Sequence, residues 1–408
     1  MAQTTEITEI IIVGGGPAGL AAAIVLARAG IQVVLCEQRS YPVDKVCGEG
    51  LMPTGVHHLR QLGVDLAAAF PLAGVRYQSP DGCVAAGRFA QGPGAGIRRT
   101  ALSQAMLAAA RQHATLSIRE NSRVQLEEAG PAGVTVRVAG ERLRARLLIG
   151  ADGLHSAVRR WADLERPGRR HWRWGVRQHY RMAPWSDSVE VYWSGRGLEA
   201  YVTPVAVNEV GVAFLWHRHS PAVEPGPSLV PALLAAFPQL ARRLQHAGPV
   251  TEARAIGPLQ QRTAAVVAEG ILLLGDAAGY LDAITGEGLS LAFAQALALE
   301  ETVVPVLRAT TGPVSRPSLA AYQKMHDAIV RPGTQVTELA LLLSRSPRLC
   351  NWIVHALHRD GALFQQLLAA NMGVRSPWRA DTLLRMAAGL LCTLPALRQP
   401  LAPSLRSS

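Results

Sequence analysis

Lysine is almost absent from this chain of 408 residues, although the chain is strongly basic. Only Lys45 and Lys324 are found among 41 Lys and Arg residues, against 30 Asp and Glu, which gives a net charge of +11. A basic balance is typical of proteins that contact nucleic acid, acidic membranes or anionic ligands. Neither a basic-plus-aromatic RNA motif nor a DNA-reading helix pattern occurs, so we expect no nucleic-acid partner.

Cysteine pairs and metal-ligand spacings are missing as well. The five cysteines form no CxxC pair, and no His or Cys group has ligand spacing, so we expect neither a redox disulfide nor a metal site. The odd number of cysteines suits a reducing compartment, and the start MAQTTEITE lacks the basic region of a secretory signal. These absences predict a cytoplasmic protein. The hydrophobic content of 49% excludes extensive disorder.

A short β-branched run opens the informative part of the chain. Ile10–Val13 predicts a buried parallel strand, and the glycine-rich segment 14–19 follows it directly. Leu20–Ala29 then predicts a helix, and 31–36 predicts a second strand that ends at Glu37. This order of strand, glycine turn, helix and strand is the fingerprint of a dinucleotide-binding unit.

Each glycine of this fingerprint has its own task. Gly14 makes the tight turn, Gly16 lets the backbone approach a pyrophosphate, and Gly19 lets the helix pack on the strand. The positive end of the helix dipole attracts the phosphates. Glu37 can accept a hydrogen bond from a ribose hydroxyl, and its charge disfavours a 2′-phosphate, so FAD or NAD is predicted rather than NADP.

Two further strand-to-turn motifs place an aspartate at the carboxyl end of a central strand. The first is 147–153 with Asp152, and the second is 271–279 with Asp276. Ligands of open α/β sheets bind at this edge. Residues 285–289 then open a helix, whose backbone N–H groups suit an anion or an electron-rich ring edge.

Together the three motifs resemble those of the flavoprotein group that contains p-hydroxybenzoate hydroxylase and geranylgeranyl reductase, over about residues 8–325. The resemblance implies bound FAD, with Arg98 and Arg99 as competing candidates for an FAD-binding arginine. It also implies NAD(P)H as a transient reductant, since no second GxGxxG occurs. The residues that it assigns to FAD are Gly14, Gly16, Pro17, Ala18, Gly19, Glu37, Gln38, Arg39, Lys45, Cys47, Gly48, Arg98, Arg99, Val124, Asp152, Gly153, Gly275, Asp276, Gly286, Glu287, Gly288 and Leu289.

The fold implied is α/β, with a Rossmann-type FAD-binding domain, an inserted antiparallel substrate sheet and a helical C-terminal region. The FAD-binding domain is expected to comprise 1–75, 95–165 and 265–325, and the substrate domain 76–94 and 166–264. Residues 326–408 form the helical region, with helices predicted at 319–330, 333–343, 349–358, 361–372 and 378–391 and a break at Arg331-Pro332. The last of these helices is apolar, and it suits packing on the flavin domain or peripheral contact with a membrane.

The segment 45–53 resembles the Lys/Arg–x–Cys–Gly segment of geranylgeranyl reductases. It supplies three catalytic candidates, Lys45, Cys47 and Glu49. A thiol beside the flavin tunes it or helps to deliver a proton, and Lys45 holds a phosphate or the flavin carbonyl edge. The competing interpretations are a small buried filler for Cys47 and a plain surface cation for Lys45.

The substrate segment departs from the reductase pattern. Where geranylgeranyl reductases carry YxWxFP, residues 199–204 keep only Tyr201, a further catalytic candidate, and Pro204. With Trp193 and Trp216 these two residues form the predicted substrate pocket, since aromatic walls suit a planar or greasy substrate. The alternative is that the tryptophans only pack the sheet.

Six arginines and no carboxylate occupy residues 166–186. Arginine forks bind phosphates and carboxylates, so this stretch suits NAD(P)H phosphates, an acidic substrate or a carrier protein. A solvated strand face is the alternative.

The leading functional interpretation is an NAD(P)H-dependent FAD monooxygenase that uses O₂ to hydroxylate a small hydrophobic aromatic, polyketide or quinol-like substrate in secondary metabolism. The alternative is a geranylgeranyl-reductase-like enzyme that saturates alkenes of an isoprenoid or polyketide lipid. The GD motif favours the reductase, because the His and Pro that follow it in aromatic hydroxylases are missing. A third interpretation is a non-catalytic FAD-binding module.

Overall fold

The central layer of the protein is an eight-stranded sheet, seen in the computed structural model, which describes residues 7–167, 173–195, 197–217, 228–374, 376 and 379–387. Its main path runs β19-β20-β11-β1-β2-β8, with β10 and β9 extending from β11. The strands β20, β11, β1, β2 and β8 are parallel, as expected for a β-branched run covered on both faces. The bounds are β1 (Ile7–Val13), β2 (Val33–Cys36), β8 (Leu116–Arg119), β9 (Val124–Gly130), β10 (Gly133–Val138), β11 (Glu141–Gly150), β19 (Val267–Ala268) and β20 (Ile271–Leu273).

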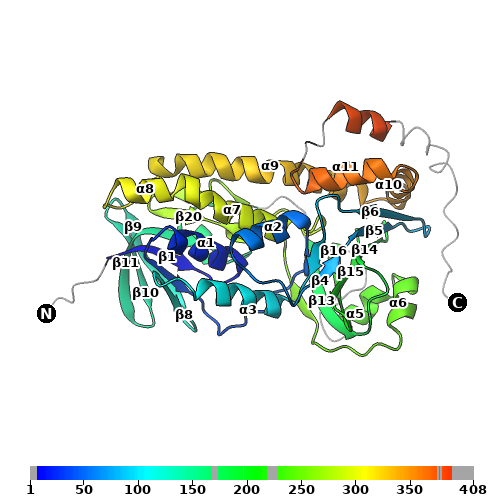
Figure 1. The fold of residues 1–408 in the computed structure, drawn as a ribbon, viewed down its shortest axis with the longest axis horizontal. Helices are drawn as coiled ribbons and strands as arrows, with labels where there is room; N and C mark the ends of the chain where they lie inside the picture. Colours follow the sequence, from blue (N-terminus) through cyan, green and yellow to red (C-terminus); the bar gives the residue numbers. More distant parts are fainter. Residues whose placement is uncertain are drawn as a thin grey trace.

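Helices cover this sheet and share one large core with it (Figure 1). These are α1 (Pro17–Arg28), α2 (Pro53–Gln61), α3 (Arg99–Ala110), α7 (Gly288–Thr302), α8 (Val304–Ala309) and the first part of α9 (Ala320–Leu343). Residues 288–309 are long and apolar enough to cross a membrane, but half of this stretch is buried and α7 packs on α1, α2 and α9. We therefore interpret it as a core helix.

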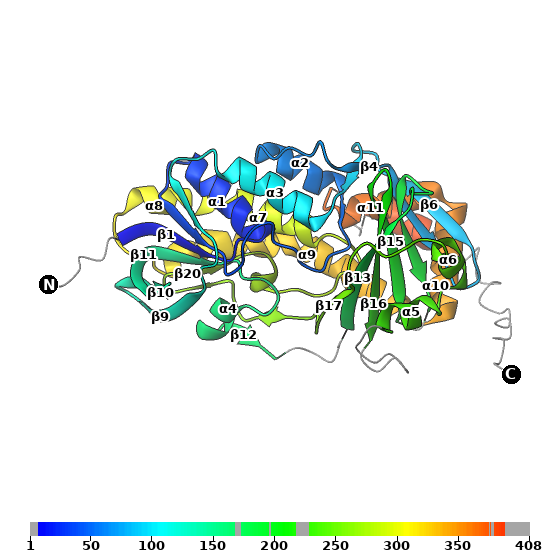
Figure 2. The same cartoon turned by 90° about the horizontal axis from the view of Figure 1, so that it is seen from below.

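A second, seven-stranded sheet lies beside the first along the long axis of the molecule (Figure 2). Its order is β17-β13-β16-β15-β14-β5-β6, and its neighbours are antiparallel except for β14 and β5. The bounds are β5 (Gly74–Gln78), β6 (Val84–Arg88), β13 (Arg173–Arg181), β14 (Ser188–Trp193), β15 (Glu199–Ala206), β16 (Glu209–His217) and β17 (Arg254–Ile256). One face packs on α5 (Leu229–Leu234) and α6 (Pro238–Leu244). The division into domains at the residues given above stays a prediction.

Short elements join the two sheets. A three-stranded sheet has the order β3-β7-β4, and β12 pairs with β18. The bounds are β3 (Gly50–Leu51), β4 (Phe70–Leu72), β7 (Gly94–Gly96), β12 (Glu165–Arg166), β18 (Arg262–Thr263), α4 (Ala157–Trp161), η1 (Gly275–Ala278) and η2 (Pro317–Leu319).

The C-terminal region is helical, as predicted, but the break at Arg331-Pro332 is wrong. The helix α9 runs unbroken from Ala320 to Leu343 with Pro332 inside it. Proline removes one backbone donor, which normally breaks or kinks a helix, but here the tertiary contacts of α9 with α7 and α11 (Gly361–Asn371) hold the helix together. The helix α10 (Pro347–Arg359) packs with α11 over β6. Of the helix predicted at 378–391, only 379–387 lie among the described residues.

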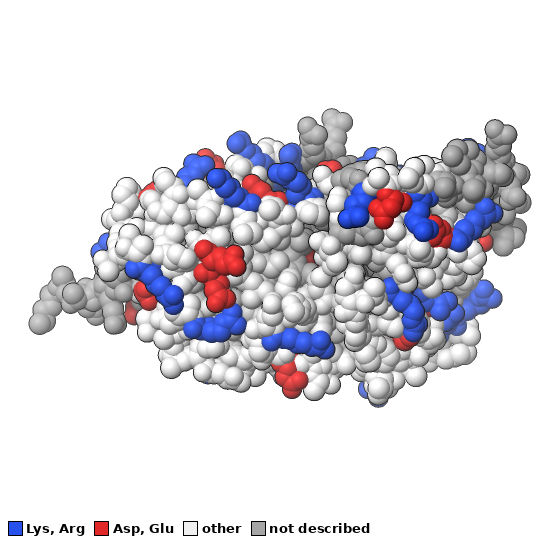
Figure 3. Space-filling view, turned by 45° about the horizontal axis from the view of Figure 1, so that its top comes forward, with Lys and Arg blue, Asp and Glu red and all other residues white. Residues whose placement is uncertain are grey.

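Charged side chains are spread over the surface. On the face drawn in Figure 3, basic and acidic groups are interspersed among larger uncharged areas instead of forming one patch.

Candidate functional site

A cavity of about 660 Å³ lies between the two sheets. One part of its wall comes from the turns at the carboxyl ends of β1, β2, β11 and β20, and another part comes from β5, β14, β15 and β16. The three glycine-containing motifs of the sequence therefore open into the same space as the second sheet.

The turn between β1 and α1 is built for close approach. Gly14 has a φ of +105°, and a Cβ there would lie 2.5 Å from the carbonyl oxygen of Ala151. A Cβ on Gly19 would lie 1.9 Å from the carbonyl oxygen of Gly14, so only glycine lets α1 pack on this turn. Gly16, in contrast, faces the cavity, and its nearest neighbour would be Lys45 Nζ at 3.5 Å. The Gly14–Gly19 segment therefore forms a tight turn whose backbone is open to the cavity at Gly16.

Glu37 is buried and holds this turn in place. Its Oε2 accepts the N–H of Gly15 at 2.7 Å, and its Oε1 accepts the N–H of Arg39 at 3.0 Å. Each oxygen keeps a second lone pair that suits a ribose hydroxyl. Glu37 is not part of the cavity wall, whereas Gln38 and Arg39 are.

Arg159 holds the second and third motifs together, a contact that the sequence did not predict. Arg159 is fully buried and donates to the carbonyl oxygens of Leu154 at 2.8 Å and Ala277 at 3.1 Å. It thereby joins the turn that carries Asp152 to the turn that carries Asp276. The sequence signal that could have identified Arg159 is its place on α4, directly after the turn that carries Asp152.

Asp152, Gly153, Asp276 and Lys45 all line the cavity. Burial raises the pKa of Asp276, against the opposing effect of Lys45, and burial lowers the pKa of Lys45. The Oδ1 of Asp152 is buried without a hydrogen-bond partner. An orphaned acceptor and a cation in a cavity beside a glycine cradle are groups that a nucleotide cofactor can satisfy.

The two candidate arginines separate clearly. Arg98 forms an ion pair with Glu209 and is not part of the cavity wall. Arg99 lines the cavity, is 5% exposed, and its Nε has no hydrogen-bond partner. The geometry therefore favours Arg99 over Arg98 as a cofactor-binding residue.

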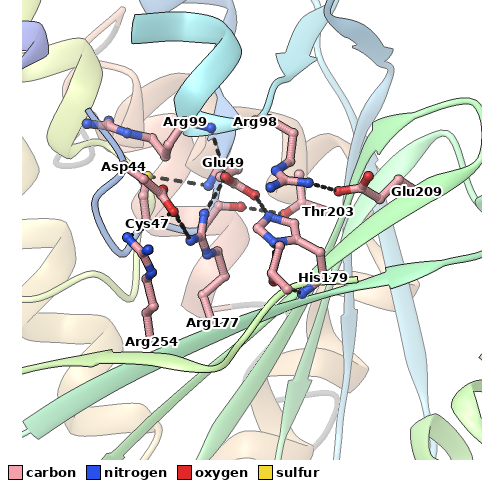
Figure 4. Close-up of polar contacts among 12 residues, drawn as sticks. Asp44, Cys47, Glu49, Arg98, Arg99, Arg177, His179, Thr203, Glu209 and Arg254 are labelled. Atoms are coloured by element: carbon pink, nitrogen blue, oxygen red, sulfur yellow. Dashed lines mark hydrogen bonds and ion pairs between the residues drawn. The ribbon is translucent and has the colours of Figure 1, made fainter. Parts of the chain in front are cut away.

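Glu49 is the centre of a buried polar network between the two sheets (Figure 4). Its Oε1 accepts the backbone N–H of Arg99 at 2.8 Å and Arg177 Nη1 at 2.7 Å, and its Oε2 lies 2.6 Å from His179 Nε2. Burial opposes ionisation, but these contacts lower the pKa of Glu49 below its usual value. Glu49 is thus a fully engaged carboxylate that positions its loop, and it lacks the spare proton of an acid catalyst.

The rest of this network comes from residues that the sequence interpretation did not pair. Arg177 Nη2 donates to both oxygens of Asp44 at 3.0 and 3.2 Å, and Arg254 Nη1 lies 3.3 Å from Asp44 Oδ2.

The arginine-rich stretch divides into two groups. Arg166 and Arg181 are exposed, as on a solvated strand face, whereas Arg177 is 1% exposed and paired with carboxylates more than 120 residues earlier. Arg169 and Arg170 lie outside the described residues, and an anionic partner for the stretch stays a prediction.

Cys47 lies on the cavity wall within the loop that this network fixes. Its Sγ accepts the N–H of Glu49 at 3.3 Å, and Thr203 Oγ1 donates to the carbonyl oxygen of Gly48 at 2.8 Å. The loop is therefore attached to β15 directly and to β13 through Glu49.

The substrate part of the wall is largely apolar, with both aliphatic and aromatic side chains. Val75, Val189, Val191 and Leu215 line it together with Tyr201, whose hydroxyl donates to the carbonyl oxygen of Ile284 at 3.2 Å. The strands β5, β14, β15 and β16 contribute no charged side chain to the cavity wall.

Three predicted pocket residues do not line the cavity. Trp216 and Pro204 alternate with the cavity-facing Leu215 and Thr203 and so point to the opposite face of the sheet, where Trp216 packs under α5 and α6. Trp193 packs beyond the cavity, 5.2 Å from the ring of Tyr77. The alternative that these tryptophans pack the sheet describes them better.

The loop before α7 brings Gly286, Gly288 and Leu289 to the cavity. Glu287 is buried beside it, Asn371 of α11 donates to its Oε1 at 3.2 Å, and burial raises its pKa to about 8. Val124, at the start of β9, is not part of the cavity wall. Among the described residues no group of His, Cys, Asp and Glu could hold a metal ion.

A second buried charge cluster lies against Tyr201. Arg173 forms ion pairs with Glu199 and, from its Nε at 3.4 Å, with Asp282 Oδ2. All three side chains are at most 4% exposed. Burial raises the pKa of Asp282 to about 6, although Arg173 opposes the shift.

We expect the stability difference between the wild type and Asp282→Asn to depend on pH. The pKa of Asp282 is about 6 in the folded state and near 4 in the unfolded state. The protonated Asp282 therefore stabilises the fold fully below pH 4, and this stabilisation is lost as pH rises through 6. Between these pH values the free energy of unfolding of the wild type should fall by about 3 kcal/mol relative to that of the variant. Urea unfolding at pH 4 to 7 measures this, with the exposed Asp163→Asn as the control for the substitution itself. If the free energies of unfolding of the wild type and Asp282→Asn changed with pH in parallel, the raised pKa of Asp282 would be contradicted.

Comparison with known proteins places these features in context. A family model described as an FAD binding domain matches residues 7–331. The menaquinone reductase of Mycolicibacterium smegmatis is 28% identical over 359 residues, which cover 82% of this chain and 84% of that protein. The digeranylgeranylglycerophospholipid reductase of Methanothrix thermoacetophila is 27% identical over 337 residues, covering 78% and 82%. A 3-amino-4-hydroxybenzoate 2-monooxygenase of Streptomyces platensis is 31% identical over 182 residues, covering 40% and 44%.

Solved structures show the same fold. The flavin-dependent brominase Bmp2 superposes with a TM-score of 0.81 at 18% identity, covering 94% of this chain and 98% of that one. A flavoprotein/dehydrogenase from Cytophaga hutchinsonii gives 0.80 at 16% identity, covering 96% and 98%. The predicted fold class and the predicted relationship to flavoprotein hydroxylases and reductases are confirmed.

Proposed function

We propose that this chain, an FAD-dependent oxidoreductase that belongs to the FAD binding domain family, reduces an alkene. The proposed substrate is hydrophobic and of isoprenoid type. The observation that carries this proposal is the continuous cavity, which joins the glycine turn after β1 to a largely apolar wall from β5, β14, β15 and β16. Arg254 of β17 also lines this cavity. A long apolar chain gains free energy from such a wall, whereas a charged substrate would lose its hydration there.

The residues present fit FAD. The cradle at Gly16 with the amino end of α1 suits the diphosphate, while Arg99, Asp152 and Lys45 offer charged groups with unmet or loosely met contacts. When bound, FAD supplies two-electron redox chemistry. The chain holds it, keeps the apolar part of the cavity dry and positions the substrate.

The reductant is proposed to be NAD(P)H, bound transiently. This follows from the sequence, in which no second GxGxxG indicates a separate nicotinamide domain. The cytoplasmic location, a carrier protein and contact with a membrane stay predictions.

Two observations favour the reductase over the monooxygenase that the sequence alone placed first. Both reductases described above match more than three quarters of this chain, whereas the monooxygenase relative matches 40% of it. The tryptophans that suggested a wall for an aromatic substrate lie outside the cavity.

A second candidate function is hydroxylation of an aromatic or quinol-like substrate with O₂, in secondary metabolism. The Streptomyces relative supports it at 31% identity over its matched part, and Tyr77 and Tyr201 offer phenol groups to a ring substrate.

The two candidates differ in the mass of the product. We expect the purified yellow protein, reduced by NADH or NADPH without oxygen, to convert an isoprenoid alkene to a product heavier by two mass units. A product heavier by 16 units, formed only with O₂, would instead identify the monooxygenase. If neither nucleotide reduces the flavin, the proposed reductant is wrong, and dithionite then tests the alkene chemistry by itself.

A further inference from the structure

Alkene reduction requires a proton donor, and the structure offers a specific one. The net reaction adds one hydride and one proton across the double bond, so that a π bond breaks and two C–H bonds form. The cofactor, recharged by the reduced nicotinamide, accounts for the hydride and both electrons. The chain must supply the proton at the cavity wall.

Several side chains with a transferable proton line the cavity: Cys47, Tyr77, His155, Tyr201 and Tyr280. Cys47 and Tyr201 are the two of these that the sequence offers as catalytic candidates. Cys47 has one hydrogen bond, from the N–H of Glu49, and Glu49 is an engaged carboxylate. A backbone N–H cannot return a proton to the thiol after the thiol has donated its own. Tyr201, in contrast, lies beside a cluster that can do so, since its hydroxyl is 3.5 Å from Glu199 Oε2.

The cluster holds two carboxylates against one guanidinium. Arg173 contacts Glu199 and Asp282 with all three side chains buried, so full ionisation would leave one uncompensated negative charge away from water. One proton on the pair of carboxylates removes that charge. When the proton is on Glu199, it is next to the Tyr201 hydroxyl.

The groups that face this cluster support a proton held there. Besides Arg173 they are the phenols of Tyr77, Tyr201 and Tyr280 and the thiol of Cys350. Burial raises the pKa of each of these four groups, so they stay neutral near pH 7. Burial raises the pKa of Asp282 to about 6, so the cluster holds this proton most fully below pH 6.

We propose that Tyr201 donates the proton to the substrate and that the Glu199–Arg173–Asp282 cluster replaces it. This inference rests on the proposed reductase function. In the step, the Tyr201 O–H bond breaks, a C–H bond forms on the alkene carbon that does not receive the hydride, and a carboxyl proton restores the phenol. Water then reprotonates the carboxylate pair.

The chain contains a matched control for Tyr201. On the neighbouring strand β14, Tyr192 donates to Glu190, also two residues away, but this pair faces α5 and α6 instead of the cavity. Tyr201→Phe and Tyr192→Phe therefore remove the same atom from the same kind of contact on opposite faces of the sheet.

The experiment uses FAD-loaded protein, reduced without oxygen and mixed with an isoprenoid alkene in H₂O and in D₂O. We expect Tyr201→Phe to slow product formation by roughly 100-fold or more, the usual contribution of general acid catalysis, with FAD binding and flavin reduction unchanged. Tyr192→Phe should match the wild type. Asp282→Asn, which keeps the Glu199–Arg173 pair, should shift the pH dependence of the rate and leave KM nearly unchanged, a result that mere structural support would not give.

Each outcome decides the matter. If Tyr201→Phe forms product at the wild-type rate, Tyr201 is not the donor. The same follows if product formation is lost in Cys47→Ala and kept in Tyr201→Phe. In both cases the reductase function stands. A wild type that leaves the alkene unchanged overturns the reductase function and this inference with it. In D₂O we expect the wild type to place deuterium on one face of the alkene carbon that receives the proton. Slow product formation by Tyr201→Phe with deuterium on both faces supports a fixed donor at this position.

Discussion

Replacing Gly16 by alanine is expected to weaken FAD binding strongly while leaving the fold intact. Gly16 has φ −72° and ψ −177°, which alanine adopts without strain, and its Cβ would meet only Lys45 Nζ at 3.5 Å. The added methyl group would nevertheless enter the cavity where the backbone must approach a phosphate. We expect the affinity for FAD to fall by roughly 100-fold or more, about 2.7 kcal/mol.

Titration of the apoprotein with FAD, followed by flavin fluorescence, measures this loss, and thermal unfolding of the apoprotein checks the fold. Gly361→Ala is the matched control, because its Cβ at the start of α11 would have no atom within 4 Å. Gly19→Ala shows the opposite pattern, since a clash at 1.9 Å should destabilise the apoprotein itself. Unchanged affinity in Gly16→Ala would contradict the assignment of this turn to the diphosphate.

Replacing Arg177 by methionine is expected to destabilise the protein by about 3–5 kcal/mol, because it removes the guanidinium paired with the buried carboxylate of Glu49 and leaves Asp44 with the half-exposed Arg254. Arg177 is the cation in contact with both Asp44 and Glu49, and its side chain is 1% exposed. Methionine replaces much of its volume, so the loss reports charge more than packing.

Urea unfolding measures this effect. Arg88→Met is the control, since Arg88 and Asp187 form a surface pair at 3.4 Å with side chains 69% and 56% exposed. A pair of that kind contributes about 1 kcal/mol at most. If both variants lost equally little stability, the network would not be the stabilising link that its geometry indicates.

The three turns that open into the cavity could be predicted because their structural requirements are local. A tight turn such as Gly14 and a helix packed close on a strand at Gly19 require glycine within a few residues, and the sequence displays that spacing. The aspartates of the other two motifs likewise follow their strands directly.

The residues that join the sheets could not be found in this way. Glu49 and Arg177 are separated by 128 residues, and nothing local marks either as the partner of the other. The pocket tryptophans failed for a different reason. Alternation along a strand identifies two faces but does not tell which of them meets the cavity, so Trp216 could not be placed until the register with β15 was known. Pro332 shows tertiary packing overriding a local breaker signal.

The attachment of the 44–50 loop to β13 and β15 constrains how new specificities arise in this architecture. If the second sheet were exchanged for that of a distant homologue, Glu49 would become an orphaned anion in the interior, and the partly exposed Asp44 would lose Arg177 and Arg254. Recombination is therefore tolerated only if Arg177 and His179 travel with their carboxylate partners. Point substitutions along β5 and β14, which this network does not touch, are the less costly route to a reshaped substrate chamber.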